Sequence, residues 1–123
     1  MSRYPGLTLR VMGAGSPAMG PGKAALVEHI EKSGSISSAA RAMGMSYRRA
    51  WQLVEALNES FAEPVVVTAI GGKRGGGAKV TAFGQELVRR FRAMESKASA
   101  AIAGDLQHLT RQLKKRPAAR GGR

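Results

Sequence analysis

The sequence predicts a mainly α-helical protein with a small β wing: a winged helix-turn-helix followed by a long C-terminal dimerisation helix. Three observations support this. One segment has the spacing of a helix-turn-helix, a glycine-rich basic segment follows a β-branched run, and a long apolar stripe comes after both. A chain of 123 residues has room for one core, so these parts are expected to share a single domain with extensions.

Small and apolar residues in the segment Ser38–Leu57 fall where a helix-turn-helix needs them. Ala39 and Ala40 are small enough for a second helix to cross close above them, and Gly44 suits a tight turn with positive φ. Three further apolar residues can hold the second helix against the domain: Ala50, Leu53 and Leu57.

Capping and helix-breaking residues mark the ends of the helices. We expect helices over approximately residues 21–33, 35–43 and 46–60. Gly34 ends the first helix, and Ser35 and Ser46 can each cap the helix that follows by accepting a backbone N–H bond. Pro64 prevents the third helix from continuing.

The segments before and after these helices have the character of strands. Alternation of Leu7, Leu9 and Val11 predicts a strand within an N-terminal extension over residues 1–20. After the helices, the β-branched run Val65–Ile70 and a return strand at Lys79–Thr81 predict a wing, which completes a winged helix-turn-helix over residues 21–81. Three basic side chains of this wing are expected to contact phosphates, unless the hairpin tip is merely solvated: Lys73, Arg74 and Lys79.

A long apolar stripe runs from Phe83 to Leu113 without a proline, and Thr81 is a good N-cap for it. We therefore expect one long helix over residues 82–114. Its spacing slips near Ala101 and Ile102, so a regular coiled coil over the whole length is not expected. The first part is expected to pack on the domain, and four later residues to form a dimer interface: Ile102, Leu106, Leu109 and Leu113.

Charge and composition narrow the class of protein. The formal net charge is +12, and much of it lies in the two ends, including the Pro- and Arg-rich residues 115–123, which are expected to be a disordered basic tail. The chain has no cysteine, so disulfides and thiolate metal sites are excluded. Its longest apolar run is far shorter than the roughly 20 residues that span a bilayer, and a cytoplasmic, nucleoid-associated protein is expected.

The second helix of the motif presents its first residues outwards, where a major groove could receive them. Ser46 and Tyr47 are assigned to phosphates, Arg48 and Gln52 to base edges, and Arg49 to either. A solvated polar helix face is the alternative interpretation. For Trp51, packing against the core or the wing is favoured over contact with DNA.

From about Leu7 to Ala98 the sequence resembles the N-terminal winged-helix domain of ModE-type molybdate-responsive transcriptional regulators. The resemblance lies in three segments, which are GSISSAARAMGMSYRRAW (residues 34–51), EPVV (63–66) and GGKRGGGAKVTAFG (71–84), and in the helix after them. The DNA-binding domain of LysR-type regulators is more distantly similar. Both families are dimers on DNA, so the resemblance implies a homodimer.

Regulators of this family carry a second domain with oxyanion-binding modules after the long helix, whereas this sequence ends in a basic tail. We therefore expect a short form without the oxyanion-binding domain, or the DNA-binding half of a longer regulator. No cofactor is evident in the chain, and molybdate or tungstate is implied by the resemblance alone. The two histidines, His29 and His108, lie far apart, and no metal site is expected.

The function that these features favour is a sequence-specific regulator of transcription that binds double-stranded DNA as a homodimer. No nucleophile, paired acid or metal set converges in the sequence, so an enzyme is not expected. Two other functions remain open: a sequence-neutral architectural DNA-binding protein, and a protein-interaction module that uses the long helix.

Overall fold

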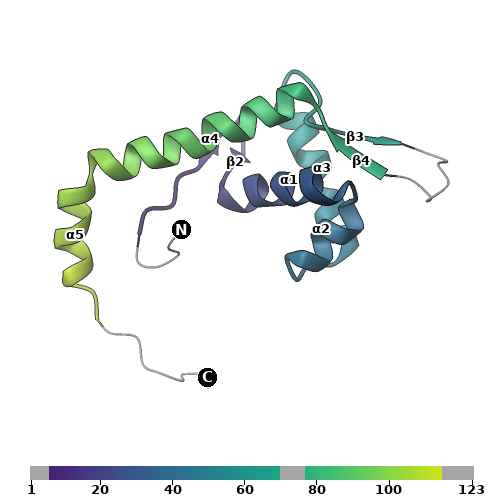
Figure 1. Cartoon of the computed structure of the whole chain (residues 1–123). Helices are drawn as coiled ribbons and strands as arrows, with labels where there is room; N and C mark the ends of the chain where they lie inside the picture. Colours follow the sequence, from purple (N-terminus) through teal and green to yellow (C-terminus); the bar gives the residue numbers. More distant parts are fainter. Residues whose placement is uncertain (1–5, 70–76, 115–123) are drawn as a thin grey trace.

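The computed structural model describes residues 6–69 and 77–114 (Figure 1). A small antiparallel sheet of β1 (Val11–Met12) and β2 (Pro17–Met19) precedes three helices, which are α1 (Pro21–Ser33), α2 (Ile36–Ala42) and α3 (Tyr47–Ser60). An antiparallel hairpin follows, made of β3 (Val66–Ala69) and β4 (Gly77–Val80). The chain then continues into α4 (Ala82–Ala101) and α5 (Ala103–Arg111). This order is that of a winged helix-turn-helix, as the sequence predicts.

The helix boundaries follow the capping residues. Gly34 ends α1 with φ 73°, and its N–H donates to the carbonyl of Ile30 at 2.7 Å. The Ser35 hydroxyl accepts from the Ser38 N–H at 3.0 Å to begin α2, and the Ser46 hydroxyl accepts from the Arg49 N–H at 3.0 Å to begin α3. These caps confirm the predicted helix starts.

Alanines allow α2 and α3 to cross closely in the helix-turn-helix. Ala39 and Ala40 on α2 and Ala50 on α3 are all buried, and Gly44 between the helices has φ 69°. Leu57 is fully buried, while Leu53 is half-buried and packs against the core. The packing that the spacing predicts is therefore present.

Asn58 ties α3 to the base of the wing. Its Oδ1 accepts from the N–H of Val65 at 2.8 Å and of Val66 at 3.1 Å, and its Nδ2 donates to the Val66 carbonyl at 2.9 Å. One side chain thus satisfies three backbone groups at the point where the chain leaves α3 for the sheet. The orientation of the wing relative to α3 depends on this amide.

The first turn of α4 packs directly on the strand base. The Thr81 hydroxyl caps α4 by accepting from the Gly84 N–H at 2.9 Å, and it donates to the Pro64 carbonyl at 2.8 Å. A Cβ at Gly84 would overlap the Val65 carbonyl oxygen and lie 2.9 Å from a methyl group of Val80. Glycine is therefore required here for helix and strand to approach each other.

The N-terminal segment differs from the prediction. The expected strand with Leu7, Leu9 and Val11 on one face is replaced by the two-residue β1, and the Gly- and Pro-rich stretch after it contains β2. Leu7 is 40% exposed, whereas Met19 of β2 is buried in the core. Alternation was misleading because so short a hairpin is stabilised by packing against the helices, which local sequence does not encode.

The predicted single long helix is interrupted. α4 ends at Ala101, Ile102 has φ −109° and ψ 13°, and α5 begins at Ala103 in a different direction (Figure 1). The break coincides with the slip in apolar spacing, and no buried residue of α5 holds it in line with α4. We call residues 94–113 the arm, which extends away from the helical domain (Figure 1).

Candidate nucleic-acid interface

The outward face of α3 carries the side chains expected to contact DNA. Ala50, Val54 and Leu57 turn the opposite face of the helix into the core. At 3.6 residues per turn, this arrangement leaves the start of the helix facing solvent. Five predicted contact residues are exposed there: Ser46, Tyr47, Arg48, Arg49 and Gln52. The structure therefore brings these five together on one accessible surface.

Their charges are available to a ligand. Among the described residues, the ion pairs of arginine side chains involve Arg89, Arg90 and Arg92, and neither Arg48 nor Arg49 takes part in one. The Ser46 hydroxyl is occupied as the acceptor of the helix cap, although its O–H can still donate. Two guanidinium groups thus lie at the start of α3 without a carboxylate partner among residues 6–69 and 77–114.

Trp51 corrects one sequence-based expectation. It was expected to pack on the core or the wing, but it is 40% exposed and lies one turn after Tyr47, which is 54% exposed. Because Ala50 faces the core, the adjacent residue on a helix points about 100° away from it. Tyr47 and Trp51 therefore add two exposed aromatic side chains to this surface. The burial of Ala50 was the signal that could have identified this exposure.

The wing lies beside the helix-turn-helix. Lys79 on β4 is exposed, as a phosphate contact requires, whereas Lys73 and Arg74 lie outside the described residues. The Ala78 N–H donates to the Gly34 carbonyl at 3.0 Å, which ties β4 to the corner between α1 and α2. The base of the hairpin is therefore attached to the domain on both sides, through this bond and through Asn58.

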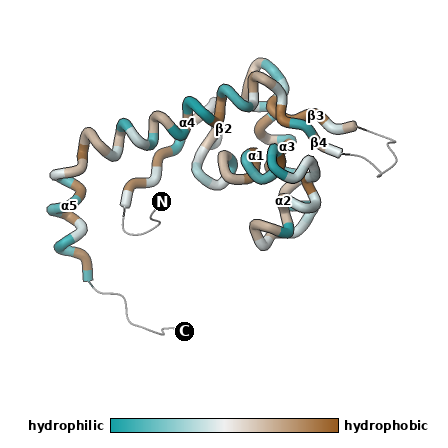
Figure 2. The backbone as a smooth tube through the Cα atoms, viewed as in Figure 1, coloured by the Kyte–Doolittle hydropathy of each residue, from teal (hydrophilic) through white to brown (hydrophobic). Residues whose placement is uncertain are grey.

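The residues predicted to form a dimer interface lie at and beyond the break after α4. Ile102 is half-buried at the junction and Leu106 half-buried on α5, while Leu109 and Leu113 are 62% and 59% exposed. Leu113 lies just beyond the end of α5. Figure 2 shows apolar segments along α5, away from the helical domain. These side chains lack a covering element among the described residues.

No group of three or more His, Cys, Asp or Glu side chains within residues 6–69 and 77–114 could hold a metal ion. In the same part of the chain, no helix has the length and apolar character to span a membrane.

A helix-turn-helix with an exposed polar start of α3 and a two-stranded wing defines a winged helix-turn-helix domain. A scan against models of protein families finds no match. Individual proteins do match. The chain is 47% identical over 78 residues to the molybdenum-pterin-binding protein MopB of Rhodobacter capsulatus, a match that covers 63% of this chain and 29% of MopB.

Two further relatives extend this result. MopA of R. capsulatus, also a molybdenum-pterin-binding protein, is 40% identical over 94 residues, which cover 76% of this chain and 36% of MopA. The DNA-binding transcriptional dual regulator ModE of Escherichia coli K12 is 41% identical over 71 residues, which cover 58% of this chain and 27% of ModE. These homologues confirm the resemblance to ModE-type regulators. The chain spans between 27% and 36% of the length of these three relatives.

Solved structures show a weaker likeness. The full-length LTTR LysG of Corynebacterium glutamicum with bound arginine matches with a TM-score of 0.49 and 24% identity, over 72% of this chain and 29% of LysG.

Proposed function

We propose that this chain is the DNA-binding part of a transcriptional regulator, and that it recognises a specific double-stranded sequence by placing α3 in the major groove. The observation that carries the proposal is the exposed start of α3, where Arg48 and Gln52 lie one turn apart and Arg48 has no ion-pair partner among the described residues. Arginine donates two hydrogen bonds to guanine and glutamine pairs similarly with adenine, so this pair can distinguish bases. The relatives named as transcriptional regulators support the same function.

The other side chains have different roles in this proposal. Tyr47 and the Ser46 hydroxyl donate to phosphates at the edge of the groove, and Lys79 supplies charge from the wing. Trp51 adds an apolar surface that can contact a thymine methyl group or a deoxyribose. Phosphate contacts then provide most of the affinity, whereas Arg48 and Gln52 provide the preference for one sequence.

A selection from random duplexes tests sequence preference. The enriched duplex and a scrambled one are compared for the wild-type chain, Arg48→Ala and a matched control, Arg90→Ala, whose arginine is exposed on α4. We expect Arg48→Ala to lose about 1–3 kcal/mol on the enriched duplex and much less on the scrambled one. Arg90→Ala should behave like wild type. Equal losses on both duplexes would favour a sequence-neutral architectural protein.

We further propose that two copies pair through the arm, which places two α3 helices on successive major grooves of an inverted repeat. Support comes from the exposed Leu109 and Leu113 and from the half-buried Leu106, which a second copy would cover. Sedimentation of the chain in solution tests this step. A monomer at all concentrations would instead favour an arm that contacts a different protein.

MopA and MopB are named as molybdenum-pterin-binding proteins. We propose that this chain binds DNA without a cofactor of its own, and that molybdate or tungstate does not alter its stability. Thermal unfolding with and without each oxyanion tests this, because a ligand that binds only the folded state must raise the melting temperature. A concentration-dependent rise would place an oxyanion site within this chain.

A further inference from the structure

A basic hollow lies beside the start of α3. Its volume is about 490 Å³, and three segments of the chain line it: the N-terminal segment, the first turn of α1 and the helix-turn-helix. Each segment contributes one cation, namely Arg10, Lys23 and Arg49. The described residues that line the hollow include no Asp or Glu. Three positive charges thus share one site without a carboxylate to balance them.

The first turn of α1 forms part of the wall. Gly20 is its N-cap and makes no side-chain cap, and the first turn contains no acidic residue. The N–H groups of Gly22 and Lys23 have no intrahelical acceptor, because the first four amides of any helix lack one. Partial positive charge at this end of the helix adds to that of the three side chains.

Gly22 leaves the backbone of this turn uncovered. A Cβ at this position would meet nothing within 4 Å, so the packing of the domain does not require glycine there. Because Gly22 has no side chain, the backbone of this turn is accessible to a ligand that must approach closely.

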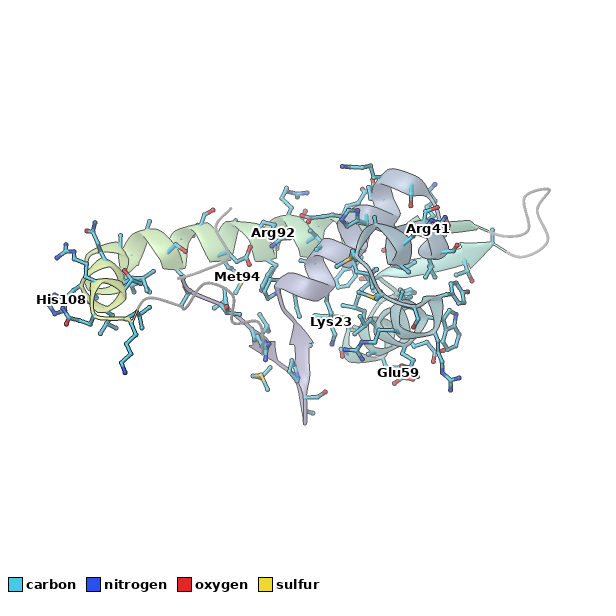
Figure 3. The ribbon with its side chains drawn as sticks, turned by 90° about the horizontal axis from the view of Figure 1, so that it is seen from below. Lys23, Arg41, Glu59, Arg92, Met94 and His108 are labelled. Atoms are coloured by element: carbon cyan, nitrogen blue, oxygen red, sulfur yellow. The ribbon has the colours of Figure 1, made fainter. Side chains whose placement is uncertain are left out.

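Lys23 occupies an unfavourable position for a cation. Its Nζ donates to the Pro17 carbonyl at 2.9 Å, and the side chain lies between α1 and α3 (Figure 3). Burial lowers the pKa of this ammonium group, and the charge of Arg49 lowers it further. An anion in the hollow would offset both effects.

We propose that this hollow binds a phosphate group, and that the phosphate belongs to the DNA backbone at the edge of the groove that α3 enters. This inference rests on the proposed function, because it is Arg49, on the first turn of α3, that links the hollow to the DNA-facing surface. Arg10 and Lys23, which the helix-turn-helix does not contain, then extend the interface onto the N-terminal segment and α1.

The salt dependence of duplex binding tests the two added cations. Arg10→Gln and Lys23→Gln are compared with two controls outside the arm, Arg90→Gln on α4 and Lys114→Gln after α5, which also remove exposed charges. Each hollow variant should lower the slope of log K against log salt by about 0.9, on enriched and scrambled duplexes alike. Slopes identical to those of the two controls would overturn the assignment.

Gly22→Gln separates binding from folding. Glutamine is a better helix former than glycine, so the variant should melt at or above the wild-type temperature. The matched control is Gly104→Gln in α5, where a Cβ also meets nothing within 4 Å, and it should melt in the same way. Only Gly22→Gln should weaken duplex binding, since its side chain covers the first turn. Duplex binding equal to that of the control would contradict a phosphate at this turn.

The NMR amide resonances of Gly22 and Lys23 distinguish a phosphate of the DNA backbone from a free phosphate ion. Duplex should shift both at stoichiometric concentrations, and inorganic phosphate should do so only far above the millimolar range. Saturation by inorganic phosphate at low millimolar concentration, with unchanged salt slopes, would assign the hollow to a free anion instead. No shift with either would overturn the site. If the wild-type chain binds no duplex, the proposed function fails, and the phosphate titration still decides whether the hollow holds an anion.

Discussion

The helical domain and the arm carry apolar residues at similar helical spacing, yet they differ in what covers those residues. In the domain, Leu26, Ile30 and Leu57 are fully buried. In α5 no residue is buried, and Leu109 is 62% exposed. The contrast shows that periodicity identifies the face of a helix that needs a partner, whereas the location of that partner depends on tertiary structure.

The largest expected effect is on the stability of the closely packed helical domain. Gly84→Ala would place a Cβ against the Val65 carbonyl, which belongs to the backbone and cannot rotate away. We expect a loss of about 3 kcal/mol in the free energy of unfolding, measured by urea denaturation. The control is Gly104→Ala in α5, where a Cβ meets nothing, and the free energy should stay constant or rise by up to about 1 kcal/mol. Equal stability of the two variants would contradict the contrast.

The attachment of the wing gives the next effect. Asn58→Ala removes a side chain that makes hydrogen bonds to Val65 and Val66, so about 2 kcal/mol of unfolding free energy should be lost. Hydrogen exchange of the β3 and β4 amides should accelerate as well. Gln107→Ala, at an exposed position of α5, serves as the control and should change neither quantity. Wing amides that remain protected in Asn58→Ala would show that another contact holds the hairpin.

On the arm, substitution should affect association rather than folding. Leu109→Asp should leave the melting temperature of the domain unchanged but weaken self-association by at least about tenfold, because a leucine buried between copies contributes about 1.5 kcal/mol or more. Sedimentation velocity over a concentration series measures this. Gln107→Asp places the same charge on a neighbouring exposed residue and should matter less. If both variants associate like wild type, the arm is not the dimer interface.

The smallest effect concerns the ion pair between α1 and α4. Arg92 donates to both carboxylate oxygens of Glu28, at 2.8 and 3.0 Å, and these bonds hold the pKa of Glu28 below its usual value. The pair therefore stabilises the fold above the ordinary glutamate pKa, and that contribution is lost as pH falls through the lowered value. Both side chains are partly exposed, so the contribution should stay below about 1 kcal/mol.

Urea denaturation at a series of pH values measures this contribution. Between pH 7 and pH 3 the wild-type chain should lose more stability than Glu28→Gln, which has no charge to titrate at this position. Parallel pH profiles would show that the Glu28–Arg92 pair adds nothing measurable.

Sequence was sufficient where local chemistry decides the structure. The hydroxyls of Ser35, Ser46 and Thr81 cap their helices, and Gly34 and Gly44 take positive φ, all within a few residues of the elements they define. The fold and the outward start of α3 follow from such signals together with apolar spacing.

The remaining features depend on contacts between distant parts of the chain. The roles of Asn58 at the wing base and of Arg10 beside α1 require elements that only the folded chain brings together. The exposure of Trp51 is not predicted, because a lone tryptophan is more often buried. The break at Ile102 is marked in the sequence only by the slip in apolar spacing, which does not by itself end a helix. Tertiary packing decides each of these cases.

The central claim is that exposed residues of α3 recognise a specific DNA sequence. One ratio of dissociation constants tests it most directly. The ratio is the dissociation constant for a scrambled duplex divided by that for the duplex enriched by selection. It is measured for the wild-type chain at about 0.15 M salt, where sequence-specific DNA-binding proteins discriminate by at least about a thousandfold. We expect a ratio of this size for the wild-type chain. A ratio near one, with tight binding to both duplexes, would contradict sequence recognition by α3.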